Sequence, residues 1–167
     1  MTLTLAAVGA VVAALLELTI VPYLQFGGAQ PDLVLVLAVI WTIVAGVEGG
    51  LAAAFIGGLT LDFLAPRPLG STAFTLLVTV GAAALLGRLF ASGRALAAIG
   101  AVVVLSVVNS LLFLVVYGAL RTPVPVDDPL GAVLPRAVYD GVLAALVAPL
   151  AVVVRNRIVE RRERFGW

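Results

Sequence analysis

The sequence contains no cysteine, no histidine and no lysine, and its charged residues make up only 11% of the chain. Without cysteine and histidine the chain has no disulfides, thiolate nucleophiles or imidazole bases, and it lacks the nitrogen and sulfur ligands of zinc, iron and copper. The absence of lysine excludes a Ser-Lys catalytic dyad. We therefore expect neither an enzyme nor a cofactor or metal site. The low charge also excludes the surface of a soluble domain.

What the chain has is apolar: 63% of its residues are hydrophobic, and the mean hydropathy is +1.22. Six apolar stretches are separated by short segments rich in Gly, Pro or Arg. They predict an all-α, polytopic integral membrane protein, a bundle of six transmembrane helices forming one domain over residues 1–154. The predicted spans are residues 3–24, 32–47, 49–65, 71–90, 95–120 and 136–154, followed by a basic tail over residues 155–167.

Arginine placement predicts the orientation, because cytoplasmic flanks of membrane proteins retain positive charge. With the N-terminus inside, the outer segments carry Arg67, Arg121 and Arg136, and the inner segments carry Arg88, Arg94, Arg155, Arg157, Arg161, Arg162 and Arg164. Both termini are therefore predicted to be cytoplasmic. Fusing the second and third spans would leave five crossings and move the N-terminus outside, and this alternative stays open.

The inner basic tail combines five arginines with Ile158, Val159, Phe165 and Trp167. Basic and apolar side chains together favour contact with anionic lipid at the inner interface, and a cytoplasmic partner is the alternative. Nucleic-acid binding is not expected, since it needs a larger wettable basic face.

Charged side chains within the spans are costly, about 2.5 to 3.5 kcal/mol for Asp at the centre of a helix. In the six-helix topology we expect an outer polar cluster, a candidate partner contact, made of Glu17, Asp32, Asp62, Arg67, Arg136, Tyr139 and Asp140. Arg136 and Asp140 share a helix face at i, i+4, and Arg–carboxylate pairing would hold the cluster together. The alternative is that these side chains reach the headgroups or cap helices, as Asp32 after Pro31 would do.

Small residues recur every four positions in the third span, which predicts a close helix-packing face formed by Gly46, Gly50, Ala54 and Gly58. This face leads to Asp62, and its packing partner is either another helix of the chain or a separate ligand or helix. In the fifth span, a polar stripe of Ser106, Asn109 and Ser110 is expected to hydrogen-bond neighbouring helices.

Two catalytic or transport alternatives have little support. Asp62 and Asp140 could form the pair of an intramembrane aspartyl protease, but the surroundings of Asp62, GLTLDFLAP, do not resemble the motifs of those enzymes. A proton relay needs protonatable groups across the whole bilayer, and the inner half of the chain supplies almost none.

Short motifs in a fixed order resemble the rod shape-determining protein MreD family, and they are Pro31-Asp32-Leu33, Glu48-Gly49-Gly50, the run from Gly57 to Asp62, and Pro68-Leu69-Gly70. The likeness is best over the second to fourth spans. The last span, with Tyr139-Asp140, Pro149 and Arg155, is similar to the C-terminal helix of that family. Arg67 between two prolines departs from the family pattern.

The resemblance implies a noncatalytic inner-membrane component of the bacterial cell-elongation complex that supports rod shape and peptidoglycan synthesis. Its implied partner is MreC, and through MreC the MreB filament, RodA and the elongation transpeptidase. It also implies a fold similar to the S components of energy-coupling-factor transporters. A solute-binding S component of a vitamin transporter is the alternative function, although only Trp41 and Trp167 supply indoles for a pocket. A secondary transporter would need broken, paired helices, which the chain lacks.

Overall fold

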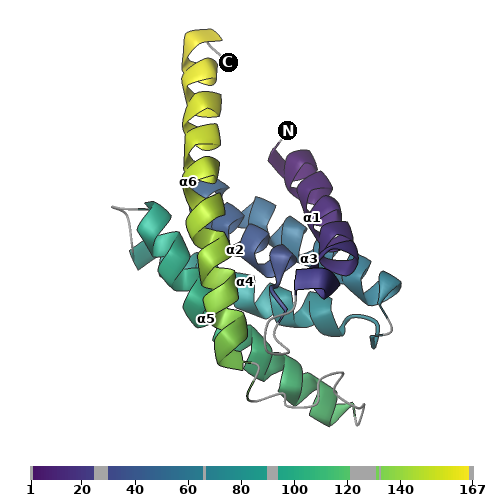
Figure 1. Cartoon of the computed structure of the whole chain (residues 1–167). Helices are drawn as coiled ribbons and strands as arrows, with labels where there is room; N and C mark the ends of the chain where they lie inside the picture. Colours follow the sequence, from purple (N-terminus) through teal and green to yellow (C-terminus); the bar gives the residue numbers. More distant parts are fainter. Residues whose placement is uncertain are drawn as a thin grey trace.

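A computed structural model describes residues 2–24, 30–65, 67–89, 94–120, 131 and 133–165. Within these ranges the chain is all-helical, with six α-helices, one short 3-10 helix and no strand (Figure 1). The elements are α1 (Thr2–Thr19), η1 (Val21–Leu24), α2 (Leu33–Ala45), α3 (Val47–Leu64), α4 (Ser71–Leu89), α5 (Arg94–Ala119) and α6 (Val133–Phe165). The prediction of an all-α fold with six helices is confirmed.

Four segments within the described residues are long and apolar enough to cross a membrane: Leu3–Tyr23, Val47–Leu64, Ala98–Ala119 and Val133–Val153. The helices Leu33–Ala45 and Ser71–Gly87 are apolar but shorter. In hydrocarbon an α-helix satisfies its own backbone hydrogen bonds, so these segments suit a lipid environment. The chain is a polytopic membrane protein.

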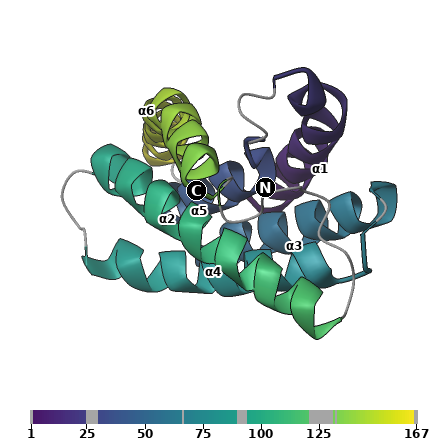
Figure 2. The ribbon, with the colours of Figure 1, turned by 60° about the horizontal axis from the view of Figure 1, so that its bottom comes forward.

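The central element of the bundle is α2. It packs against α1, α3, α4, α5 and α6, and its side chains Leu35 and Ile40 are almost completely buried. The other five helices follow one another around it, since α1 contacts α3, α3 contacts α4, α4 contacts α5 and α5 contacts α6. Figure 2 shows α1 and α6 standing apart, with α3, α4 and α5 along the other side of the molecule.

Gly46 separates α2 from α3. Its φ of +117° lies in the left-handed region that favours glycine, its backbone N–H donates to the carbonyl oxygen of Trp41, and it is exposed. The two helices pack against one another, so they are not one fused helix. Gly46 is therefore not part of the helix-packing face expected from its spacing: the turn needs this glycine, and its surroundings are open.

The remaining small residues of α3 lie at close helix contacts inside the chain. A Cβ at Gly50 would overlap the hydroxyl of Thr42 in α2, and a Cβ at Gly58 would come 2.5 Å from Cα of Ala73 in α4. Ala54 between them is completely buried. Gly50, Ala54 and Gly58 thus allow the backbone of α3 to approach its neighbours.

Candidate functional site

Asp32 lies at the N-terminus of α2, where several charged side chains meet. Its Oδ1 accepts a hydrogen bond from the backbone N–H of Leu35 at 2.9 Å, so Asp32 is the N-cap of the helix. Its Oδ2 accepts from Arg136 of α6 at 3.1 Å and from Asn109 of α5 at 3.4 Å. One buried carboxylate therefore joins three helices.

Asp140 of α6 reaches the same helix end and is completely buried. Its Oδ1 accepts from the backbone N–H of Asp32 at 2.7 Å, and its Oδ2 accepts from the hydroxyl of Ser106 in α5 at 2.5 Å. Arg136, at i−4 from Asp140, forms an ion pair with Asp32 instead of with Asp140. The packing of α6 against α2 brings the guanidinium of Arg136 to Asp32.

Glu17 of α1 is the third carboxylate at this place. Its Oε2 accepts from the backbone N–H of Val34 at 3.2 Å, and its side chain is buried. The N–H groups of Asp32, Val34 and Leu35 are among those that α2 cannot pair within its own first turn. Three carboxylates satisfy them at the positive end of the helix dipole, which explains how acidic side chains are tolerated here. We call Glu17, Asp32, Arg136 and Asp140 the α2-cap cluster.

The polar stripe of α5 connects the α2-cap cluster, which lies on α1, α2 and α6, to α4. The amide oxygen of Asn109 accepts from the hydroxyl of Thr79 in α4 at 3.3 Å, while its amide nitrogen donates to Asp32. Ser106 donates to Asp140. The sequence predicted helix-to-helix hydrogen bonds for this stripe but did not connect them with the carboxylates. Thr79 was not predicted from the sequence, and the feature that could have identified it is a hydroxyl side chain at the depth of Asn109.

Asp62 belongs to a separate group of contacts. Its carboxylate accepts from the backbone N–H groups of Thr72 and Ala73, at 3.1 to 3.3 Å, and from the hydroxyl of Ser71 at 3.5 Å. It therefore caps α4 from the end of α3. The outer polar cluster expected as one group is divided in two, because each carboxylate is held at the N-terminus of the helix beside it.

Arg67 lies with Asp62 and not with the α2-cap cluster. It donates to the hydroxyl of Thr72 at 3.4 Å, and its guanidinium carbon lies 5.8 Å from the ring centroid of Phe113 in α5. These contacts replace the carboxylate pairing expected for Arg67. Tyr139 is half-buried on α6 beside Asp140.

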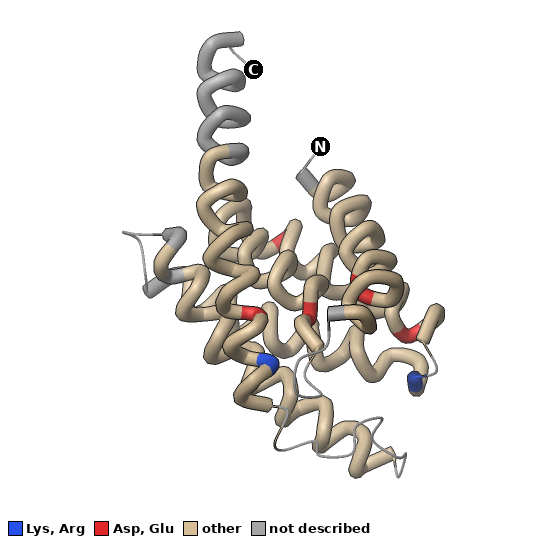
Figure 3. The backbone as a smooth tube through the Cα atoms, viewed as in Figure 1, with Lys and Arg blue, Asp and Glu red and all other residues tan. Residues whose placement is uncertain are grey.

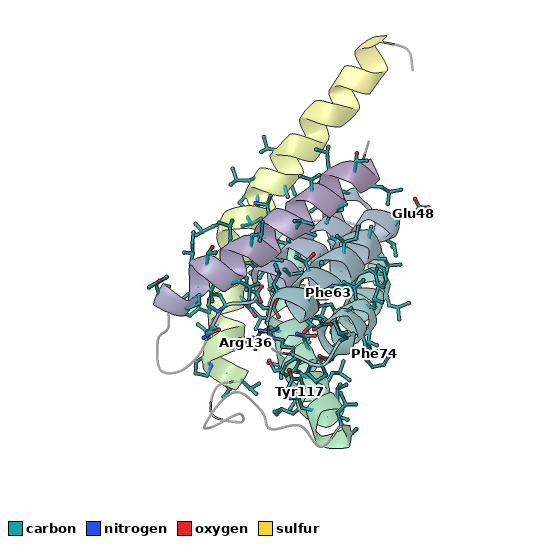
Figure 4. All side chains as sticks on the ribbon, turned by 90° about the vertical axis from the view of Figure 1, so that its right-hand side faces the viewer. Glu48, Phe63, Phe74, Tyr117 and Arg136 are labelled. Atoms are coloured by element: carbon teal, nitrogen blue, oxygen red, sulfur yellow. The ribbon has the colours of Figure 1, made fainter. Side chains whose placement is uncertain are left out.

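Most of the charged residues whose side chains the structure describes lie at one level of the bundle (Figure 3). Figure 3 shows most of the marked acidic and basic residues in one band across the helices, and Figure 4 shows Arg136 far from the exposed Glu48. Within the described residues, no group of three acidic side chains is arranged to hold a metal ion. The side chains of Arg155, Arg157, Arg161, Arg162 and Arg164 lie outside the described residues, although the backbone of α6 is helical to Phe165.

The comparisons with known proteins give one match. The family model of the rod shape-determining protein MreD matches residues 1–154, which is most of the chain. No curated protein and no solved structure matches. The matched region includes α1 to α5 and the part of α6 that carries Arg136 and Asp140. The chain is therefore a multi-pass membrane protein that belongs to the rod shape-determining protein MreD family.

Proposed function

We propose that this protein is a scaffold of the cell-elongation complex that binds MreC through the outer part of its bundle and thereby supports peptidoglycan synthesis. The observation that carries the proposal is the α2-cap cluster together with Ser106, Asn109 and Thr79, since their buried hydrogen bonds tie α1, α2, α4, α5 and α6 together. Such a network favours a rigid binding surface over a site for a chemical reaction.

Rigidity matters for binding because a preorganised surface loses little conformational freedom when its partner docks. Arg136 is the point at which the α2-cap cluster reaches the surface: its side chain is 29% exposed, whereas that of its partner Asp32 is 3% exposed. A partner that contacts Arg136 would therefore engage a side chain already held in place by an ion pair. Of the residues of the outer polar cluster, the partly exposed Arg67, Arg136 and Tyr139 are the proposed direct contacts, and the buried Glu17, Asp32, Asp62 and Asp140 would hold the helices that present them.

The further partners belong to the same proposal. Through MreC the protein would be linked to RodA, the elongation transpeptidase and the MreB filament, and its basic tail would contact anionic lipid at the cytoplasmic face. α1 begins and α6 ends toward the same end of the molecule, which supports the proposal that both termini are cytoplasmic (Figure 1). The α2-cap cluster would then lie near the outer interface.

The test is recovery of MreC with the purified protein in detergent. Arg136→Ala and Asp62→Ala are the test variants, and Glu48→Ala is the control, because Glu48 is exposed and lies far from Arg136. We expect the test variants to recover less MreC and to give misshapen cells, while the control behaves like the wild type. Each variant must elute from size exclusion as a single species. Unchanged recovery with normal cell shape would contradict the docking role.

A further inference from the structure

Arg67 has no carboxylate partner among the residues that the structure describes. The side chains of two arginines are described, Arg67 and Arg136, and the ion pair between described residues joins Arg136 to Asp32. The guanidinium of Arg67 donates to the neutral hydroxyl of Thr72 at 3.4 Å. A guanidinium carries five N–H donors, so this one long hydrogen bond leaves most of its donor capacity for another acceptor.

Asp62 is the nearest acidic residue in the sequence, but its carboxylate is committed to α4. It accepts hydrogen bonds from the backbone N–H groups of Thr72 and Ala73 and from the hydroxyl of Ser71. It is buried and forms no ion pair with Arg67. A partly buried guanidinium without a counter-ion is unfavourable, because it has lost water and gained no opposite charge in return. Arg67 is therefore suited to an anion from outside the described part of the chain.

Two neighbouring helices hold the guanidinium of Arg67 in place. Its Cζ lies 5.8 Å from the ring centroid of Phe113 in α5, within the range of a cation–π contact. The ring of Phe113 stacks in turn on that of Tyr117, with the centroids 4.3 Å apart. Thr72 contacts the guanidinium from α4. An arginine held in this way loses little conformational freedom when it binds an anion.

The surroundings of Arg67 place it at the edge of the hydrocarbon. It lies in the turn between α3 and α4, three residues beyond the apolar segment Val47–Leu64. Large apolar side chains are exposed on both sides of this turn, and they are Phe63, Leu64, Leu69 and Phe74. In a membrane protein such side chains contact acyl chains, while an arginine close to the end of a span reaches the headgroups. The anions at that level are lipid phosphates.

We propose that Arg67 binds the phosphate group of a membrane lipid at the turn between α3 and α4. Phosphate oxygens match the planar donors of a guanidinium, which can hold two of them at once. A lipid is favoured over soluble phosphate because the exposed apolar side chains beside Arg67 would contact its acyl chains. The inference goes beyond the proposed function, since Arg136 stays available to MreC when Arg67 holds a lipid.

The experiment uses the full chain in vesicles of diglucosyl diacylglycerol, a lipid without phosphate. The protein has no native cysteine, so one introduced cysteine carries a fluorophore at a chosen position. Leu69→Cys reports on Arg67, and Leu134→Cys is the matched control. Each position is two residues from an arginine, and the two leucines are 69% and 71% exposed. The positions differ in that Arg136, beside the control, is already paired with Asp32.

The readout is quenching of the fluorophore by a small fraction of lipid that carries a nitroxide near the top of one acyl chain. This lipid is either phosphatidylglycerol or the diglucosyl lipid, and the ratio of the two quenching values measures the local preference for phosphate. We expect the ratio at Leu69→Cys to be about three- to fivefold higher than at Leu134→Cys, as for a partly exposed ion pair. Adding Arg67→Gln should lower it to the control value. Arg67→Lys, which keeps the charge but not the planar donors, should give an intermediate ratio.

Inorganic phosphate, added at constant ionic strength, distinguishes the two sources of the phosphate group. An unchanged ratio at Leu69→Cys supports a lipid ligand, and a lower ratio supports the same phosphate site with a soluble ligand. Equal ratios at the two cysteine positions, or an unchanged ratio after Arg67→Gln, would overturn the inference. The comparison of the two positions keeps Arg67 unaltered, so it remains valid if an Arg67 variant is unstable. Recovery of MreC is measured separately and tests the proposed function alone.

Discussion

Gly58→Ala is expected to destabilise the bundle at the contact of α3 with α4. The added Cβ would lie 2.5 Å from Cα and 2.8 Å from the backbone nitrogen of Ala73, and backbone atoms cannot move aside as a flexible side chain can. Overpacking of this kind typically costs about 1 to 3 kcal/mol. Asp62, one turn after Gly58, caps α4 at Thr72 and Ala73, so separating the two helices would also lengthen those hydrogen bonds.

The matched control is Gly81→Ala in α4, where an added Cβ meets nothing within 4 Å. This change should leave stability equal or raise it by about 0.5 to 1 kcal/mol, because alanine favours a helix over glycine. A loss of about 2 kcal/mol corresponds to a decrease in Tm of roughly 4 to 8 °C for a chain of this length. Thermal unfolding in detergent, followed by circular dichroism, measures both variants. Equal Tm values for Gly58→Ala and Gly81→Ala would refute the close approach of α3 to α4.

Three further outcomes are expected. Asp140→Ala should lower the free energy of unfolding by about 1 to 3 kcal/mol, because it leaves the buried N–H of Asp32 without an acceptor. Asp140→Asn keeps an acceptor and should cost less in the same thermal assay. A larger loss of stability for Asp140→Asn than for Asp140→Ala would contradict the hydrogen bond. Thr79→Val removes a hydroxyl that donates to the carbonyl oxygen of Thr75 at 2.8 Å and lies 3.3 Å from the amide oxygen of Asn109, and it should cost about 1 kcal/mol, again as a lower Tm. Reporter fusions at the two termini should both indicate the cytoplasm, and a periplasmic signal at the N-terminus would favour five crossings.

The six helices could be expected from local features of the chain. Apolar runs long enough for a helix are separated by breakers such as the segment containing Pro68 and Gly70, and a helix in lipid satisfies its own backbone. The break expected at Glu48 lies instead at Gly46. Where a residue acts through its neighbours in sequence, as Asp32 does at the start of α2, the expected role as an N-cap agrees with the structure.

The grouping of the charged side chains depends on contacts between helices distant in sequence. Spacing within α6 suggested that Arg136 and Asp140 act together, whereas packing gives Arg136 to Asp32 and lets Asp140 hold Ser106 and the N–H of Asp32. Local sequence cannot specify such pairs, because hydrogen bonding depends on which helix end each carboxylate meets after packing. Hydrophobic run length therefore predicts the helices, while the packing of five helices around α2 creates the α2-cap cluster and the opening between α6 and α1.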